Sequence, residues 1–83
     1  MTLPKEIVDF IQAGATREGC AYPGPTEELF NQGILDSFDL VDFVTLVEEH
    51  CDISIPDEDV NRANFRNLET IEQYIASRAN GNG

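Results

Sequence analysis

Helical periodicity is the feature that most constrains the fold of this chain. Apolar residues recur at intervals of three and four over residues 3–17, 37–50 and 68–78, which places them on one face of a helix. Residues 51–56 alternate like a strand, but they are too few and too isolated to belong to a sheet. We therefore expect an all-α fold, a small bundle of three main helices and one short helix.

The first predicted helix, over residues 3–17, is followed by a long loop. Thr2 is expected to cap this helix, and Pro4 suits its first turn. Residues 18–25 are too rich in proline and glycine to hold regular structure. A short helical turn over Thr26–Phe30, capped by its threonine, is then expected to pin the loop to the core.

The C-terminal half contains the short helix and the last long one. Residues 57–60 follow a proline and carry acidic side chains, which a helix N-terminus favours, so they predict the short third helix. Asn67 is expected to cap the last helix. The apolar stripe of that helix contains Leu68, Ile71, Tyr74 and Ile75. We expect residues 1–79 to form one domain and residues 80–83 to be a frayed tail.

The predicted helix over 37–50 has two faces of different character. Its inner arc contains Leu40, Phe43, Val44 and Val47. The polar side chains of the opposite arc include Asp42, Thr45 and Glu49. Phe38 projects into the middle of this outer arc, with Val41 at its border, which predicts an apolar contact patch within an acidic rim. The alternative is that Phe38 folds back against the preceding loop.

Charge and length limit the classes of function. With 16 acidic and five basic residues, the net charge of −11 should repel nucleic acid and anionic lipid and favour basic protein surfaces. A chain of 83 residues can bury one small core, so a large active-site cavity is not expected and we predict no enzymatic activity. The sequence has no signal peptide pattern and no membrane span, which predicts a cytoplasmic protein.

No metal or redox site is indicated by residue spacing. Cys20 and Cys51 belong to no C-x-x-C pair, so free thiols are expected, with a structural disulfide as the alternative. Residues 57–61 have the Asp-x-Asp-x-Asn start of a calcium loop. The glycine required at its sixth position is replaced by Arg62, and the glutamate required at its twelfth by Leu68.

Residues 33–38 place a serine at the start of the central helix. Asp36 or Ser37 is the expected N-cap, because both follow a glycine turn and precede an apolar helical run. A catalytic serine is not indicated, since the one histidine, His50, lies roughly 20 Å farther along the same helix. Three interpretations of Ser37 remain: a structural cap, a kinase substrate, and an exposed hydroxyl beside a docking surface.

The chain resembles the acyl carrier protein and peptidyl carrier protein superfamily. The resemblance rests on the segment LFNQGILDSF at residues 29–38, the acidic amphipathic helix that follows, and the segment IPDED at residues 55–59. It spans about residues 26–76. It implies that Ser37, preceded by Asp36, is the attachment point of 4′-phosphopantetheine, whose thiol carries cargo as a thioester.

The resemblance also implies a set of partners. The arm comes from coenzyme A through a phosphopantetheinyl transferase, an adenylating ligase or acyltransferase loads it, and downstream condensing or transferring enzymes receive the cargo. The positions that correspond to the recognition helix of the family are Phe38, Val41, Asp42, Thr45, Glu48 and Glu49. We expect a monomer without a metal site.

The subtype resembles stand-alone aminoacyl or D-alanyl carriers more than fatty-acid carriers, which usually have Ala-Asp-Ser-Leu. Asp39 and the segment 64–67 depart from the D-alanyl pattern, and Thr45 departs from the fatty-acid pattern. A biosynthetic carrier of an aminoacyl or small hydroxyacyl unit is the first interpretation and a general acyl carrier the second. A small acidic adaptor without a prosthetic group is the alternative from another class.

Overall fold

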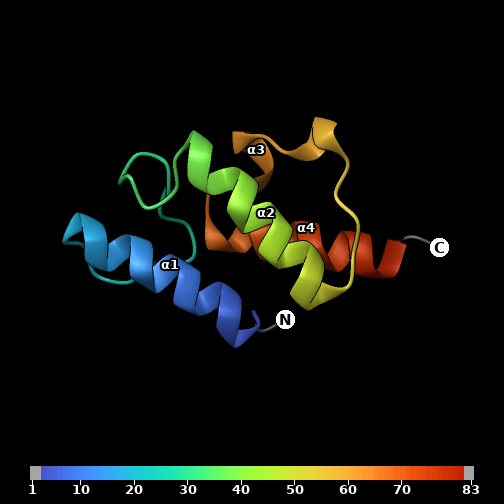
Figure 1. Ribbon diagram of the computed structural model, residues 1–83, viewed down its shortest axis with the longest axis horizontal. Helices are drawn as coiled ribbons and strands as arrows, with labels where there is room; N and C mark the ends of the chain where they lie inside the picture. Colours follow the sequence, from blue (N-terminus) through green and yellow to red (C-terminus); the bar gives the residue numbers. More distant parts are fainter. Residues whose placement is uncertain (1–2, 82–83) are drawn as a thin grey trace.

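The computed structural model describes residues 3–81, and the side chains of residues 3–79. This part of the chain is all-α and contains no strand, as predicted. Figure 1 shows the four α-helices. In chain order, the elements are α1 (Lys5–Glu18), α2 (Ser37–Cys51), the 3₁₀ turn η1 (Asp57–Asp59), α3 (Arg62–Phe65) and α4 (Leu68–Gly81).

Helices α1 and α2 run antiparallel (Figure 1). The start of α1 meets the end of α2, where Glu6 lies 3.6 Å from His50, and the end of α1 meets the start of α2, where Arg17 lies 3.3 Å from Asp39. The long loop between them, residues 19–36, turns back at this second end. The start of α2 is therefore held between the loop and α1.

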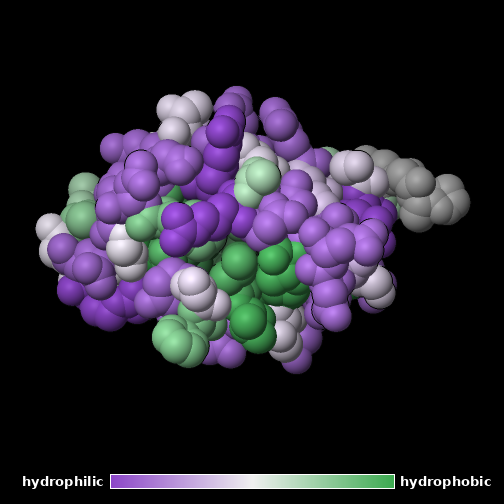
Figure 2. Space-filling view, turned by 90° about the horizontal axis from the view of Figure 1, so that it is seen from above, coloured by the Kyte–Doolittle hydropathy of each residue, from purple (hydrophilic) through white to green (hydrophobic). Residues whose placement is uncertain are grey.

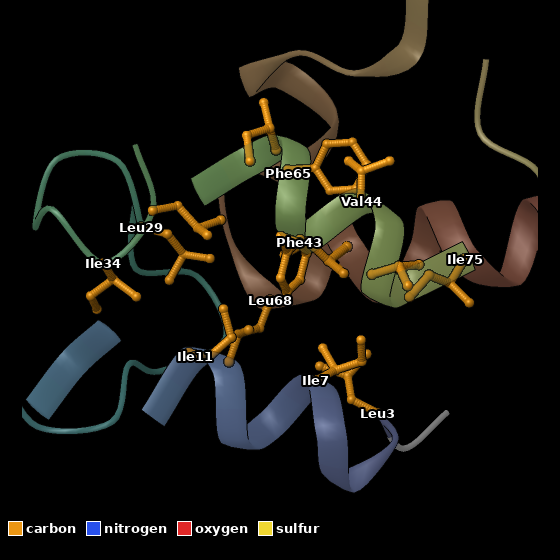
Figure 3. Packing of buried hydrophobic residues seen from close by; sticks show 14 of the residues in the cluster. Leu3, Ile7, Ile11, Leu29, Ile34, Phe43, Val44, Phe65, Leu68 and Ile75 are labelled. Atoms are coloured by element: carbon orange, nitrogen blue, oxygen red, sulfur yellow. The ribbon is translucent and has the colours of Figure 1, made fainter. Parts of the chain in front are cut away.

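One hydrophobic core joins all four helices (Figure 3). The predicted stripe of α1 is confirmed, since Ile7 and Ile11 are fully buried and Phe10 is half-buried. The predicted inner arc of α2 is also buried. Full burial of a side chain as large as Phe43 contributes about 1.5–3 kcal/mol. The rotation of each long helix about its axis therefore follows from its apolar stripe.

The start of α1 differs from the prediction. The helix begins at Lys5, and Pro4 stands at the cap position without a side-chain hydrogen bond; Thr2, the expected cap, lies outside the described residues. The end of the helix, at Glu18, agrees with the predicted range of 3–17 to within one residue. Proline cannot donate a backbone hydrogen bond, so it suits the entry of a helix, where that donor has no partner.

The short helical turn expected over 26–30 is absent, because longer-range hydrogen bonds hold this segment. The Leu29 N–H group donates to the carbonyl oxygen of Arg66 at 2.8 Å, and the Leu29 side chain is fully buried. Glu27, not Thr26, closes the local turn: its carboxylate accepts from the Gly24 N–H group at 2.7 Å. The loop is thus pinned to the core by Leu29, as expected, but without helical structure.

The short third helix exists, but it begins later than predicted. Residues 57–59 form only a 3₁₀ turn, because Val60 leaves the helical region at ψ 80°. Asn61 then caps α3 by accepting a hydrogen bond from the Asn64 N–H group at 3.1 Å. The predicted cap of α4 is confirmed, since Oδ1 of Asn67 accepts from Thr70 at 2.8 Å.

Helix α4 is described through Gly81. Residues 82 and 83, the last two of the predicted tail over 80–83, lie outside the described residues, so the tail stays a prediction.

Helix α2 begins at Ser37, and the preceding residue is its cap. Oδ1 of Asp36 accepts hydrogen bonds from the N–H groups of Phe38 and Asp39, at 2.9 and 2.8 Å. Of the two candidates for the N-cap, Asp36 is therefore the one that fills the position. The Ser37 side chain takes no part in the cap.

Substitution of Asp36 tests this assignment. Asp36→Ala is expected to lower the free energy of unfolding by about 1 kcal/mol, because two N–H groups lose their acceptor. Asp36→Asn keeps a side-chain oxygen and is the matched control, with a smaller expected loss. Urea unfolding monitored by circular dichroism measures both. Equal losses for the two variants would contradict a capping role.

Gly14 marks a close approach of α1 to the segment that precedes α2. A Cβ atom at this position would lie 2.6 Å from the carbonyl oxygen of Ile34, which is too close without a backbone shift. The residue is buried. Glycine at this point lets the backbone of α1 lie close to the backbone of Ile34.

Gly14→Ala is therefore expected to destabilise the protein although alanine is the better helix former. Helix propensity alone favours alanine by about 1 kcal/mol, but the clash should reverse the sign and give a net loss of about 1–2 kcal/mol. Ala13→Gly, at an exposed position in the same helix, is the control for propensity alone. A Gly14→Ala variant that unfolds at higher urea concentration than the wild type would show that the approach is not tight.

Candidate functional site

Ser37 is the first residue of α2 and is exposed to solvent. Because Asp36 satisfies the N–H groups of the first turn, the serine hydroxyl is not needed as a cap. The hydroxyl takes no part in the side-chain hydrogen bonds of the cap, which both go to Asp36. A hydroxyl in this position is open to chemical modification by another protein.

The surroundings of Ser37 do not make it a nucleophile. His50 lies at the other end of α2, where it is near Glu6 on α1 at 3.6 Å, so no imidazole stands beside the serine. Roughly 20 Å of helix separate the two residues, as their spacing requires. A base for the Ser37 hydroxyl would therefore have to come from a partner.

The outward face of α2 carries two exposed apolar side chains close to Ser37. Phe38 is 86% exposed and Val41 is 60% exposed. The alternative that Phe38 folds back against the preceding loop is therefore wrong. Large apolar side chains exposed in this way are typical of surfaces that contact another protein.

The polar residues that were predicted to lie on the outer arc of α2 are exposed, with one exception. Asp42, Thr45 and Glu49 face solvent. Glu48 instead is half-buried, and its Oε2 atom accepts a hydrogen bond from the Ile55 N–H group at 2.8 Å. Glu48 thus ties α2 to the segment after it, a structural role that the helical period alone does not reveal.

A groove of about 440 Å³ lies between α2 and the segment that contains Ile55 and η1. It is lined by Val41, Val44, Thr45, Glu48, Ile55, Asp57 and Val60. The face of the molecule seen in Figure 2 shows apolar surface gathered near its middle and bordered by hydrophilic side chains. Residue spacing did not predict this groove, although the alternation at residues 53–55 was a signal for a segment packed on α2.

Two contacts from α4 hold the outer wall of the groove in place. The Tyr74 hydroxyl donates to Oδ2 of Asp59 at 2.7 Å, and Nε of Arg78 donates to the Ser54 carbonyl oxygen at 3.1 Å. Burial, and then the hydrogen bond to Asp59 and its negative charge, raise the pKa of Tyr74 to about 12. The phenol is therefore neutral and able to donate at all ordinary pH values.

The other candidate groups do not gather into a site. Cys20 and Cys51 are free thiols, and burial raises the pKa of the Cys51 thiol. The described residues contain no cluster of three or more metal-ligating side chains, at 57–61 or elsewhere. Within residues 3–81, no helix combines the length and apolar character that crossing a membrane requires.

The site at the start of α2 fits a phosphate-bearing prosthetic group. The serine hydroxyl is exposed, and the positive end of the α2 dipole lies directly beside it. No side chain covers Ser37, so an attached arm would extend into solvent or along the outer face of the bundle.

Comparison with known proteins agrees with this geometry. Residues 15–75 match the family described as "Phosphopantetheine attachment site", in which 4′-phosphopantetheine is attached to a serine. A comparison with curated proteins found none that matches. Domains of this family interact with the transferase that adds the arm and with biosynthetic enzymes, and they are not themselves catalytic. Since the match covers more than half of the chain, the protein belongs to the phosphopantetheine-binding family of acyl and peptidyl carrier proteins.

Proposed function

We propose that this protein carries an acyl or aminoacyl group on a 4′-phosphopantetheine arm attached to Ser37. The observation that carries the proposal is the exposed Ser37 hydroxyl at the start of α2, beside a cap supplied wholly by Asp36. We also propose that residues 1–79 act as one carrier domain and that the protein is monomeric. When bound, the arm supplies a thiol that holds cargo as a thioester.

Among the serines of the chain, Ser37 suits attachment best. The sequence contains Ser37, Ser54 and Ser77, and only the first two lie within the matched residues 15–75. Ser54 lies in the extended segment after α2, and its carbonyl oxygen is bonded to Arg78. Only Ser37 stands at a helix N-terminus, where the helix dipole favours a phosphate.

Partner enzymes would dock on the outward face of α2. Phe38 and Val41 offer an apolar anchor close to Ser37, and Asp42, with the other exposed acids, offers a negative rim for basic partner surfaces. Thr45 and Glu49 extend this face along the helix. The proposed partners are the transferase, a loading ligase or acyltransferase, and an enzyme that receives the cargo.

For the cargo, we propose an aminoacyl or small hydroxyacyl unit within a biosynthetic pathway, with a general acyl group as the second candidate. Thr45, Glu48 and Asp57 give the groove beside α2 a partly polar lining. A lining of this kind supports short polar cargo over a long hydrocarbon chain, which favours wholly apolar surroundings.

Attachment is tested by incubation with coenzyme A and a promiscuous phosphopantetheinyl transferase. The wild type is expected to gain one arm per chain by intact-mass analysis, Ser37→Ala to gain none, and Ser54→Ala, the matched control, to gain one. Modification of Ser37→Ala would place the arm elsewhere. A wild type that several transferases leave unmodified would instead favour an acidic adaptor without a prosthetic group.

Docking is tested by Phe38→Ala and by Asp42→Lys. Each is expected to raise the KM of the transferase for the carrier, by about tenfold for Phe38→Ala if it is the central anchor. The unfolding midpoint should stay near that of the wild type, because both side chains are exposed. Tyr22→Ala, which removes an exposed aromatic side chain from the loop after α1, is the control. A KM unchanged in both α2 variants would remove this face from the docking surface.

A further inference from the structure

Arg17, near the end of α1, contacts the chain on both sides of Ser37. Its Nη2 atom donates to the carbonyl oxygens of Gly33 and Ile34, at 3.1 and 3.4 Å, and to Oδ2 of Asp39 at 3.3 Å. Gly33 and Ile34 precede the cap of α2, whereas Asp39 lies in the first turn. One guanidinium nitrogen therefore joins the turn before the serine to the helix after it.

The carbonyl oxygens of Gly33 and Ile34 precede α2 and so lie outside its ladder of backbone hydrogen bonds. The corresponding N–H groups are bonded within the loop, that of Ile34 to the Leu29 carbonyl oxygen at 3.0 Å. Arg17 supplies the donor for the oxygens. The guanidinium therefore satisfies backbone carbonyl groups of the turn, in addition to forming a surface ion pair.

Arg17 stays protonated and positively charged. A hydrogen bond to Glu18 and the negative charges of Asp39 and Asp36 raise the pKa of its guanidinium above the ordinary value. The side chain is half-exposed. Exposed ion pairs contribute little to stability, so the effect of this contact should be sought in geometry.

We propose that Arg17 is a positioning residue for the attachment serine. By holding the 33–34 turn against the first turn of α2, it fixes the direction of the Ser37 hydroxyl when another enzyme transfers the arm to it. Arg17 does not act on the hydroxyl itself. This role rests on the proposed attachment at Ser37. Through Arg17, α1 would help to position the serine for the transferase.

The test compares Arg17→Gln with Arg78→Gln. Both variants remove one charge and the side-chain hydrogen bonding to backbone carbonyl groups, which is to Gly33 and Ile34 for Arg17 but to Ser54, away from the turn, for Arg78. With a phosphopantetheinyl transferase and coenzyme A, Arg17→Gln is expected to lower kcat by about tenfold with little change in KM, because a misplaced nucleophile slows the reaction of the bound complex. Arg78→Gln should leave both values within about twofold of the wild type.

Hydrogen exchange of the unmodified proteins gives a readout that does not depend on the transferase. The N–H groups of Gly33, Ile34 and Leu35 are expected to exchange faster in Arg17→Gln than in Arg78→Gln. Should Arg17→Gln fail to fold, Asp39→Ala removes one of the three acceptors of Nη2 from the α2 side, and its kcat should fall by about threefold at unchanged KM.

The outcomes separate this inference from the proposed function. A wild type that gains no arm contradicts attachment at Ser37. A wild type that is modified, together with equal kcat values for Arg17→Gln and Arg78→Gln, overturns the role of Arg17 alone. A rise in KM at constant kcat overturns it as well, because Arg17 would then contribute to docking and not to positioning.

Discussion

The burial of Phe43 is the constraint on which the functional face of α2 depends. Its ring is fully buried, 5.4 Å from the Phe10 ring on α1 and 6.2 Å from the Phe65 ring on α3. Successive residues turn by about 100° around a helix. Fixing Phe43 inward therefore turns Phe38 and Val41 outward, as their exposure shows. Packing in the core therefore determines which side chains of α2 are exposed to a partner.

Capping and presentation are divided between two neighbouring residues at the start of α2. Asp36 satisfies the first N–H groups, so Ser37 can be modified without loss of the cap. On the other side of the turn, Gly14 and Arg17 bring α1 against Ile34. A small bundle thereby holds one serine in a defined place.

The sequence predicted those parts of the fold that depend on local periodicity. The inner arc of α2, the exposure of Phe38 and the cap at Asn67 all follow from residue spacing, and the structure confirms them. Local residue spacing does not predict contacts between residues that are far apart in the sequence. Leu29 bonds Arg66, which replaces the expected turn at 26–30, and Glu48 bonds the backbone after α2, which no helical wheel reveals. The groove beside α2 was missed for the same reason.

Fragmentation of the intact protein from its native cell, followed by mass analysis, shows which group the cell attaches to the chain and at which residue. Attachment at Ser37 predicts a single 4′-phosphopantetheine, with or without cargo, on fragments that contain Ser37 and on none that contain only Ser54 or Ser77. A native protein whose Ser37 fragments carry no added mass would contradict it. The cargo found on the arm would also identify the chemical class of the carried group.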